Sequence, residues 1–99
     1  MNKKISKNDE FNHFNKIAKE WWKPYGKFKI LHDILPIRME YILKNLKNKK
    51  IKDIEILDLG CGGGLTCEAL SRLGANVSGI DFVKTNIKVA KNHALKSKL

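Results

Sequence analysis

The spacing of apolar residues changes character near the middle of the chain, at about residue 50. Before that point apolar side chains recur every three or four residues, the period of a helix that packs along one face. The spacing predicts a first helix over residues 9–22, which Pro24 ends because the residue before a proline avoids helical backbone angles. A second helix is predicted over about residues 36–47, with Pro36 in its first turn, where a missing N–H is tolerated.

After residue 50, short apolar runs alternate with segments of helical spacing. The runs at residues 55–59 and 76–80 predict two strands, and the second run is followed by an acid. Between them residues 65–73 predict a helix that Gly74 closes, and a last helix is predicted over about residues 87–96. A strand, a helix and a strand joined by short loops imply a parallel pair with a right-handed crossover. The predicted fold class is therefore α/β, with two N-terminal helices followed by β-α-β-α.

Composition narrows the class of protein only slightly. A chain of 99 residues suits one small domain, which we divide into a helical segment, residues 1–50, and a β-α-β-α segment, residues 51–99. The formal charge of +10 comes from lysines scattered over every segment, so a small basic binding module for nucleic acid or acidic lipid is a weaker alternative. No stretch is apolar for long enough to span a bilayer, and the start lacks the apolar core of a secretory signal. Cys61 and Cys67 have no second pair, which predicts no zinc site and a reducing, cytosolic setting.

The most informative stretch reads ILDLGCGGGLTC, over residues 56–67. Glycine weakens helices and strands, so four glycines in five positions indicate backbone that must turn sharply or approach a ligand closely. The dinucleotide fingerprint G-x-G-x-x-G fails, because Leu65 occupies its third glycine position, and no Gly-Lys-Ser/Thr follows for a phosphate loop. The pattern present is G-x-G-x-G, formed by Gly60, Gly62 and Gly64. Such a turn opens a helix whose first N–H groups would face a ligand.

Two acids near these glycines define the ligand. Asp58 precedes the first glycine by two residues, where it would repel a pyrophosphate and suit an ammonium group and a sulfonium. Asp81 lies 21 residues after Gly60, at the end of the second strand, where a carboxylate can accept from ribose hydroxyls. Together these features describe S-adenosylmethionine. The plainer alternatives are a tight strand-to-helix turn and, for Asp81, a helix N-cap.

The chain resembles the class I S-adenosylmethionine-dependent methyltransferases, through DLGCGGG and the later VSGID. The segment WWKPYGKFKILHDILPIR, Trp21–Arg38, further resembles the ubiquinone-biosynthesis O-methyltransferases, as W-W-x-x-x-G-x-F-x-x-L-H-x-I-x-P-x-R. The resemblance runs from about residue 17 to residue 95. It implies a Rossmann-like fold in which Arg38, Gly60 and Asp81 bind the cofactor. A guanidinium suits the methionine carboxylate of that cofactor, and Asp58 would lie near its amino group.

The resemblance also implies a reaction and its partners. These are methyl transfer to a phenolic oxygen of a polyprenylated phenol or quinone precursor, a cytoplasmic location, and peripheral contact with lipid at the inner membrane. The same resemblance implies an N-terminal portion only, with an incomplete sheet and no assignable catalytic residue. We therefore expect no activity of these 99 residues alone. They would act with a complementing C-terminal chain, or else be a nonfunctional remnant.

The remaining aromatic and histidine side chains are given structural roles. Trp21 and Trp22 are predicted to pack in a core or lid rather than against a substrate. His13 and His93 fall on polar helix faces and are predicted to be exposed. His32 is predicted to make a structural hydrogen bond.

Overall fold

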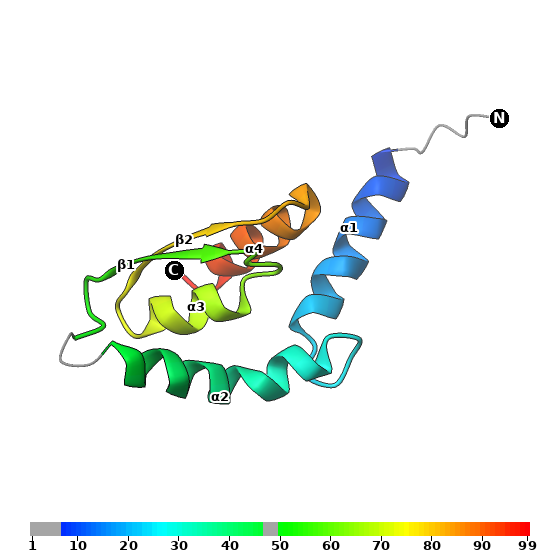
Figure 1. Ribbon diagram of the computed structural model, residues 1–99. Helices are drawn as coiled ribbons and strands as arrows, with labels where there is room; N and C mark the ends of the chain where they lie inside the picture. Colours follow the sequence, from blue (N-terminus) through cyan, green and yellow to red (C-terminus); the bar gives the residue numbers. More distant parts are fainter. Residues whose placement is uncertain (1–6, 47–49) are drawn as a thin grey trace.

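The computed structural model describes residues 7–46 and 50–99, which form helices and a small sheet in the order α1, α2, β1, α3, β2, α4 (Figure 1). The elements are α1 (Lys7–Trp22), α2 (Lys29–Asn45), β1 (Glu55–Leu59), α3 (Leu65–Arg72), β2 (Asn76–Ile80) and α4 (Lys84–Lys96). This order is the predicted α/β class, two helices followed by β-α-β-α.

The end of α1 is confirmed, whereas the predicted start of α2 is wrong. Helix α1 stops at Trp22, just before the Lys23-Pro24 pair. A tight turn follows, in which Gly26 N donates to Lys23 O at 3.3 Å, and α2 begins at Lys29. Pro36 therefore lies inside α2 and not in its first turn.

Helix α2 can begin before Pro36 because a proline inside a helix removes one backbone hydrogen bond, and α2 tolerates the loss of that bond. The helix is already established by then, since Leu31 N donates to Phe28 O at 3.0 Å. It is also held against α3 by tertiary contact, which can override a local helix breaker. The helix ends with Leu46 N donating to Ile42 O, and the predicted end at residue 47 lies outside the described residues.

The sheet is a parallel pair, as predicted. Its register runs from Glu55 opposite Asn76 to Leu59 opposite Ile80, and α3 forms the crossover between the strands. Helix α3 ends at the predicted glycine: Gly74 has a φ of 99°, and its N–H donates to Ser71 O at 2.9 Å.

The last helix begins three residues earlier than predicted, at Lys84 instead of Ile87. Its first turn is held by Asp81, whose Oδ1 accepts from Val83 N at 2.8 Å. Ile87 N then donates to Val83 O at 3.4 Å. The helix therefore begins before Ile87, the first apolar residue from which its periodicity could be predicted.

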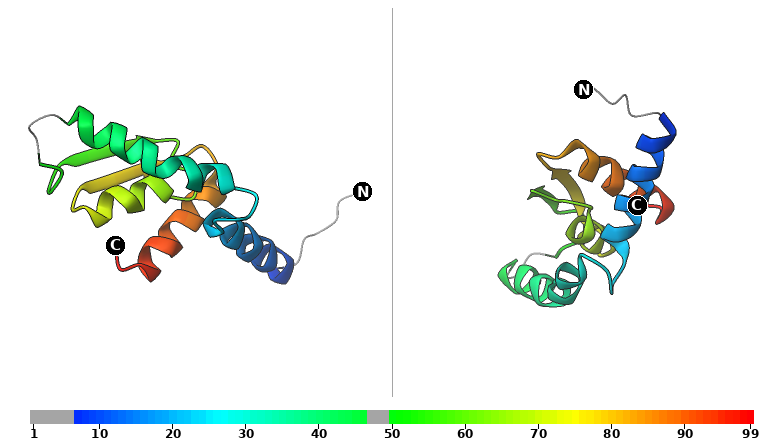
Figure 2. Two further views of the ribbon diagram at one scale, coloured as in Figure 1. Left: turned by 90° about the horizontal axis from the view of Figure 1, so that it is seen from below. Right: turned by 90° about the vertical axis from the view of Figure 1, so that its right-hand side faces the viewer.

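The core is small and lies where α3 and α4 meet the sheet. Leu70 and Val89 are its most deeply buried large side chains, with 2% and 1% of their surface exposed. Burial along β1 alternates, so that Leu57 and Leu59 remain 57% and 70% exposed on the sheet face that α3 does not cover. Figure 2 shows α2 and α3 stacked on one side of the two strands, with none of the described helices on the other side. None of the helices in the described part of the chain combines the length and hydropathy needed to cross a membrane.

A buried carboxylate joins α1, α3 and α4. Glu68 of α3 is 3% exposed, and its Oε2 lies 2.6 Å from Nδ1 of His93 on α4. Its Oε1 accepts from Arg72 at 3.4 Å. The His93 ring in turn stacks on Trp22 of α1, with ring centroids 3.4 Å apart and planes 2° from parallel. The prediction that His93 is exposed is therefore wrong, because its apparently polar helix face packs against α1 and α3, whereas His13 is exposed as predicted.

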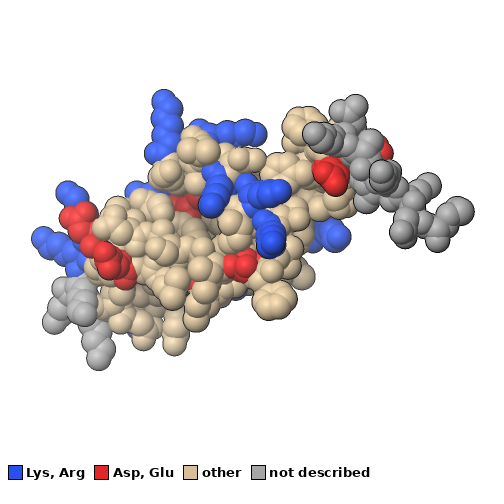
Figure 3. All heavy atoms as spheres, turned by 90° about the horizontal axis from the view of Figure 1, so that it is seen from above, with Lys and Arg blue, Asp and Glu red and all other residues tan. Residues whose placement is uncertain are grey.

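Charged side chains are dispersed over the surface. Figure 3 shows Lys and Arg in separate groups on the face it presents, with acidic side chains between them. The net charge of +10 is thus not gathered into one stripe on this face. Such a distribution gives the nucleic-acid alternative no specific support.

Candidate cofactor site

A cavity of about 410 Å³ opens at the carboxyl end of β1. This is the edge at which open α/β sheets bind ligands. Its lining comes from both halves of the chain: Trp21, Leu31, Arg38, Ile42, Asp58, Leu59, Gly60, Cys61, Gly62, Leu65 and Thr66. Four of the predicted cofactor residues, Arg38, Asp58, Gly60 and Gly62, therefore meet around one space.

Arg38 reaches the cavity from α2. Its side chain is exposed, and Nη1 donates to Oγ1 of Thr66 at 3.4 Å, in the first turn of α3. The guanidinium therefore lies beside the start of a helix and opposite the glycine loop, residues 60–64. Its remaining N–H donors suit a carboxylate, which a guanidinium can hold with two parallel bonds.

The glycine loop needs glycine at three positions for its backbone alone. The φ angles of Gly60, Gly62 and Gly64 are 77°, 55° and 94°, in the region where a Cβ is strained. At Gly60 an added Cβ would meet no atom within 4 Å, so this position is open toward the cavity it lines.

Four amides of the loop bond within the protein, while the expectation that the first N–H groups of α3 face the ligand stays a prediction. The N–H groups of Gly60 and Cys61 both donate to Ile80 O, at 2.7 and 2.9 Å. Gly62 N donates to Asp81 Oδ2 at 2.9 Å, and Gly64 N donates to Cys61 O at 3.1 Å. These four amides hold the loop to β2 and to itself. A ligand would therefore meet the loop at the bare Cα of Gly60 rather than at these donors.

The other glycines of the loop lie under neighbouring helices. A Cβ on Gly62 or Gly63 would come within 2.6 Å of the Trp21 ring, and one on Gly64 would come within 3.0 Å of Ala90 Cβ on α4. Gly64 does not line the cavity. Its observed contacts are those of helix packing, and its assignment to the cofactor stays a prediction.

Asp81 lies beside the glycine loop and outside the cavity lining. Its carboxylate accepts from Val83 N at 2.8 Å and Asn86 Nδ2 at 3.2 Å through Oδ1, and from Gly62 N through Oδ2. The N–H groups of Val83 and Gly62 hold the pKa of this carboxyl below its usual range. A carboxylate has about four acceptor positions, so Oδ2 retains one for a further donor such as a ribose hydroxyl.

Asp58 contributes a carboxylate to the cavity wall and interacts with a thiol behind it. Cys67 Sγ donates to Asp58 Oδ2 at 3.4 Å. Burial and the negative charge of Asp58 raise the pKa of Cys67 to about 12, and burial also raises the pKa of Cys61. Both cysteines are free, as expected for packing residues.

We expect Cys67 to resist alkylation by iodoacetamide at pH 8 in the folded chain. With a pKa of about 12 its thiolate fraction falls roughly a thousandfold below that of an ordinary thiol, and only the thiolate reacts. Fragmentation mass spectrometry of the peptide that contains both cysteines measures the rate at each. The same chain in urea is the control, where both thiols react at the rate of free cysteine. Equal rates at Cys67 in the two conditions would contradict the burial of this thiol beside Asp58.

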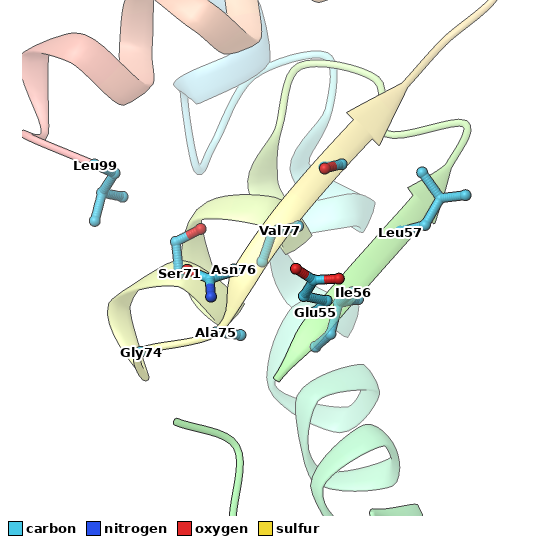
Figure 4. A pocket seen from close by; sticks show the side chains of 10 residues that line it. Glu55, Ile56, Leu57, Ser71, Gly74, Ala75, Asn76, Val77 and Leu99 are labelled. Carbon is cyan, nitrogen blue, oxygen red and sulfur yellow. The ribbon is translucent and has the colours of Figure 1, made fainter. Parts of the chain in front are cut away.

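Two further features of the described residues concern metal ligands and a second hollow. No group of three or more His, Cys, Asp or Glu side chains in this part of the chain could hold a metal ion. A larger hollow of about 840 Å³ lies against β1 and β2, where Figure 4 shows side chains of both strands, the end of α3 and Leu99. It reaches the sheet at the first residues of both strands and contains none of the predicted residues, so we place the candidate site at the smaller cavity.

Sequence reasoning missed the side chains that support the site. Trp21 lines the cavity and its Nε1 donates to Asn86 Oδ1 at 3.2 Å, while Thr66 receives the Arg38 bond. That Trp21 does not contact a substrate stays a prediction, whereas its packing is confirmed by the stack on Phe28 and the contact with the glycine loop. The structural bond of His32 is also confirmed, since its Nε2 lies 2.8 Å from Trp21 O. The pairing with Asn86 spans 65 residues, and no local pattern in the sequence signals it.

Comparison with known proteins first defines the class. Residues 57–99 match the family described as "Methyltransferase domain". Two solved structures of WbdD, one described as a bifunctional kinase-methyltransferase, superpose with a TM-score of 0.61 and 26% identity. They cover 86% of this chain and 22% and 21% of theirs. The described residues therefore form part of a methyltransferase fold.

Closer relatives narrow the class. The chain is 53% identical over 98 residues to the ubiquinone biosynthesis O-methyltransferase of Pelagibacter ubique (strain HTCC1062), covering 91% of this chain and 41% of that protein. It is 46% identical over 100 residues to the protein of the same description from Bartonella quintana (strain Toulouse), covering 92% and 40%. The resemblance to ubiquinone-biosynthesis O-methyltransferases is thus confirmed. The chain spans about two fifths of the length of these relatives.

Proposed function

We propose that this chain forms the S-adenosylmethionine-binding part of an O-methyltransferase of ubiquinone biosynthesis. The observation that carries the proposal is the cavity in which Arg38, Asp58 and Gly60 converge at the carboxyl end of β1. The guanidinium of Arg38, proposed for the methionine carboxylate, and the carboxylate of Asp58, proposed for the amino group, thus lie beside the open backbone of Gly60. Asp81, one loop away, retains an acceptor for the ribose.

The two segments of the chain have separate tasks in this proposal. Residues 51–99 supply the strand ends and the glycine loop, and residues 1–50 form a cap over the cofactor. The cavity lining supports this division, because Trp21, Leu31, Arg38 and Ile42 come from the helical segment. Closing the cap would exclude water from the sulfonium and hold it in line with an acceptor oxygen.

The descriptions of the relatives and the chemistry of the cofactor support the proposed reaction. When bound, S-adenosylmethionine supplies an electrophilic methyl group on a sulfonium. We propose a phenolic hydroxyl of a polyprenylated ring as the acceptor, reached from the cytoplasmic side with peripheral contact with the membrane. Since the relatives are more than twice as long, the acceptor site and the base that ionises the phenol are assigned to residues outside this chain, for example on a complementing chain. The 99 residues alone are then expected to bind cofactor without transferring methyl groups.

Titration with S-adenosylhomocysteine, followed by calorimetry, tests the proposed function. We expect saturable one-site binding that the Arg38→Gln variant weakens by at least about tenfold, since a hydrogen bond to a charged group is worth roughly 1.5–3 kcal/mol. Lys44→Gln is the matched control, because it removes an exposed cation from the same helix outside the cavity lining. Its dissociation constant is expected to stay within about twofold of the unmodified value, as for an exposed charge remote from the ligand.

Two outcomes would count against the proposal. Absence of binding by the folded unmodified chain would refute a cofactor site in these residues. If Arg38→Gln and Lys44→Gln weakened binding of S-adenosylhomocysteine equally, the affinity would depend only on the overall charge of the chain.

A further inference from the structure

We propose that Asn86 is a positioning residue, which couples the docking of α1 to the carboxylate of Asp81. The inference rests on the proposed function, in which Asp81 receives the ribose of the cofactor. Asn86 itself lies in the first turns of α4 and outside the cavity lining. Its effect on the cofactor would therefore pass through Asp81.

The side chain of Asn86 bridges a donor and an acceptor. Trp21 Nε1 donates to Asn86 Oδ1 at 3.2 Å, and Asn86 Nδ2 donates to Asp81 Oδ1 at 3.2 Å. An indole N–H can only donate and a carboxylate can only accept, so one orientation of the amide satisfies both neighbours. The bridge joins the end of α1, the start of α4 and the loop after β2.

Both ends of this bridge return to the glycine loop. The Trp21 ring lies directly over Gly62 and Gly63, where an added Cβ would come within 2.6 Å of it. At the other end, Asp81 Oδ2 accepts from Gly62 N at 2.9 Å. Trp21, Asn86, Asp81 and Gly62 thus form a closed circuit of contacts.

The position of Trp21 follows that of the N-terminal helices. Its ring stacks on Phe28, with centroids 4.0 Å apart and planes 7° from parallel, and its carbonyl bonds to His32 of α2. If α1 separates from the glycine loop, Asn86 loses the donor that fixes its amide, and Asp81 loses one of three bonds that orient its carboxylate. A ligand that needs the oriented carboxylate therefore favours the docked helix, and by linkage the docked helix favours the ligand.

The first arm of the test needs no ligand. We measure hydrogen exchange of the two indole N–H groups by nuclear magnetic resonance. The Asp81→Asn variant frees the Asn86 amide to turn, so we expect exchange at Trp21 to rise about fivefold or more. Exchange at Trp22, which lies on the same helix and donates to Gly63 O of the glycine loop, is expected to rise as well, and Asp33→Asn on the exposed face of α2 is the matched control variant. Unchanged exchange at Trp21 would overturn the coupling.

The second arm uses S-adenosylhomocysteine and its analogue without the ribose 2′-hydroxyl. In Asn86→Ala we expect the affinity for S-adenosylhomocysteine to fall about fivefold and that for the analogue to change little, with Asn92→Ala on the exposed side of α4 as the control. Equal losses for both ligands would mean that Asn86 supports the fold only, and would overturn its positioning role. If the unmodified chain binds neither ligand, the proposed function fails, and the exchange arm still decides whether the bridge couples α1 to Asp81.

Discussion

Replacing His93 with alanine is expected to lower the free energy of unfolding by about 3 kcal/mol, the sum of a charged hydrogen bond and an aromatic stack. The bond is the 2.6 Å contact with the carboxylate of Glu68, which is 3% exposed. Among the described residues this buried group would then keep Arg72, at 3.4 Å, as its side-chain partner, and a buried charge that loses a partner is costly. The stack is the contact with Trp22, which connects α4 to α1.

Urea unfolding followed by circular dichroism measures this loss of stability. Two further variants separate its contributions and provide a control. His93→Phe keeps a ring for Trp22 but no donor for Glu68, so it should lose most of the hydrogen-bond contribution alone. His13→Ala removes an exposed histidine from α1 and should change stability by less than about 0.5 kcal/mol. A His93→Ala chain as stable as His13→Ala would show that the contacts of Glu68 and Trp22 contribute nothing in solution.

Gly63→Ala is expected to release α1 from the glycine loop. The new Cβ would come within 2.6 to 2.8 Å of three atoms of the Trp21 ring, distances that force the ring to move. We expect a loss of about 2 kcal/mol, typical of overpacking at a close contact. Tryptophan emission should shift to the red, because the displaced indole meets water.

Gly60→Ala is the matched comparison, since it adds the same methyl group to the same loop. Nothing lies within 4 Å of its Cβ, so only the strain at a φ of 77° opposes it, at about 1 kcal/mol. Its tryptophan emission should equal that of the unmodified chain. Identical emission and stability in the two variants would mean that Trp21 does not lie on the loop. Gly60→Ala should nevertheless weaken the binding of S-adenosylhomocysteine, because the added methyl group occupies space in the cavity.

Features set by local chemistry could be predicted from the sequence. Pro24 ends α1, Gly74 ends α3, and the two apolar runs form a parallel pair. The cavity also gathers Arg38 and Asp58 as the proposed cofactor would require. Each of these depends on a turn residue, a short periodicity or a motif within a few positions.

Features set by contacts distant in sequence could not be predicted. Pro36 predicts a helix start because proline is common at helix boundaries, whereas packing on α3 lets the helix continue through it. His93 lies on an apparently polar face of α4 until α1 and α3 supply its partners. The bridge from Trp21 to Asp81 through Asn86 likewise exists only once three segments have come together.

The sheet face that α3 does not cover also governs how stability responds to temperature. Leu57 and Leu59 stay 57% and 70% exposed in the folded chain, so unfolding brings little of their surface into new contact with water. The heat capacity of unfolding rises with newly exposed apolar surface and should lie below the roughly 12–15 cal/mol/K per residue of ordinary domains. A smaller heat capacity flattens the curve of stability against temperature. This sheet would therefore unfold over a broad range of temperature. Cooling would change its free energy of unfolding only slightly.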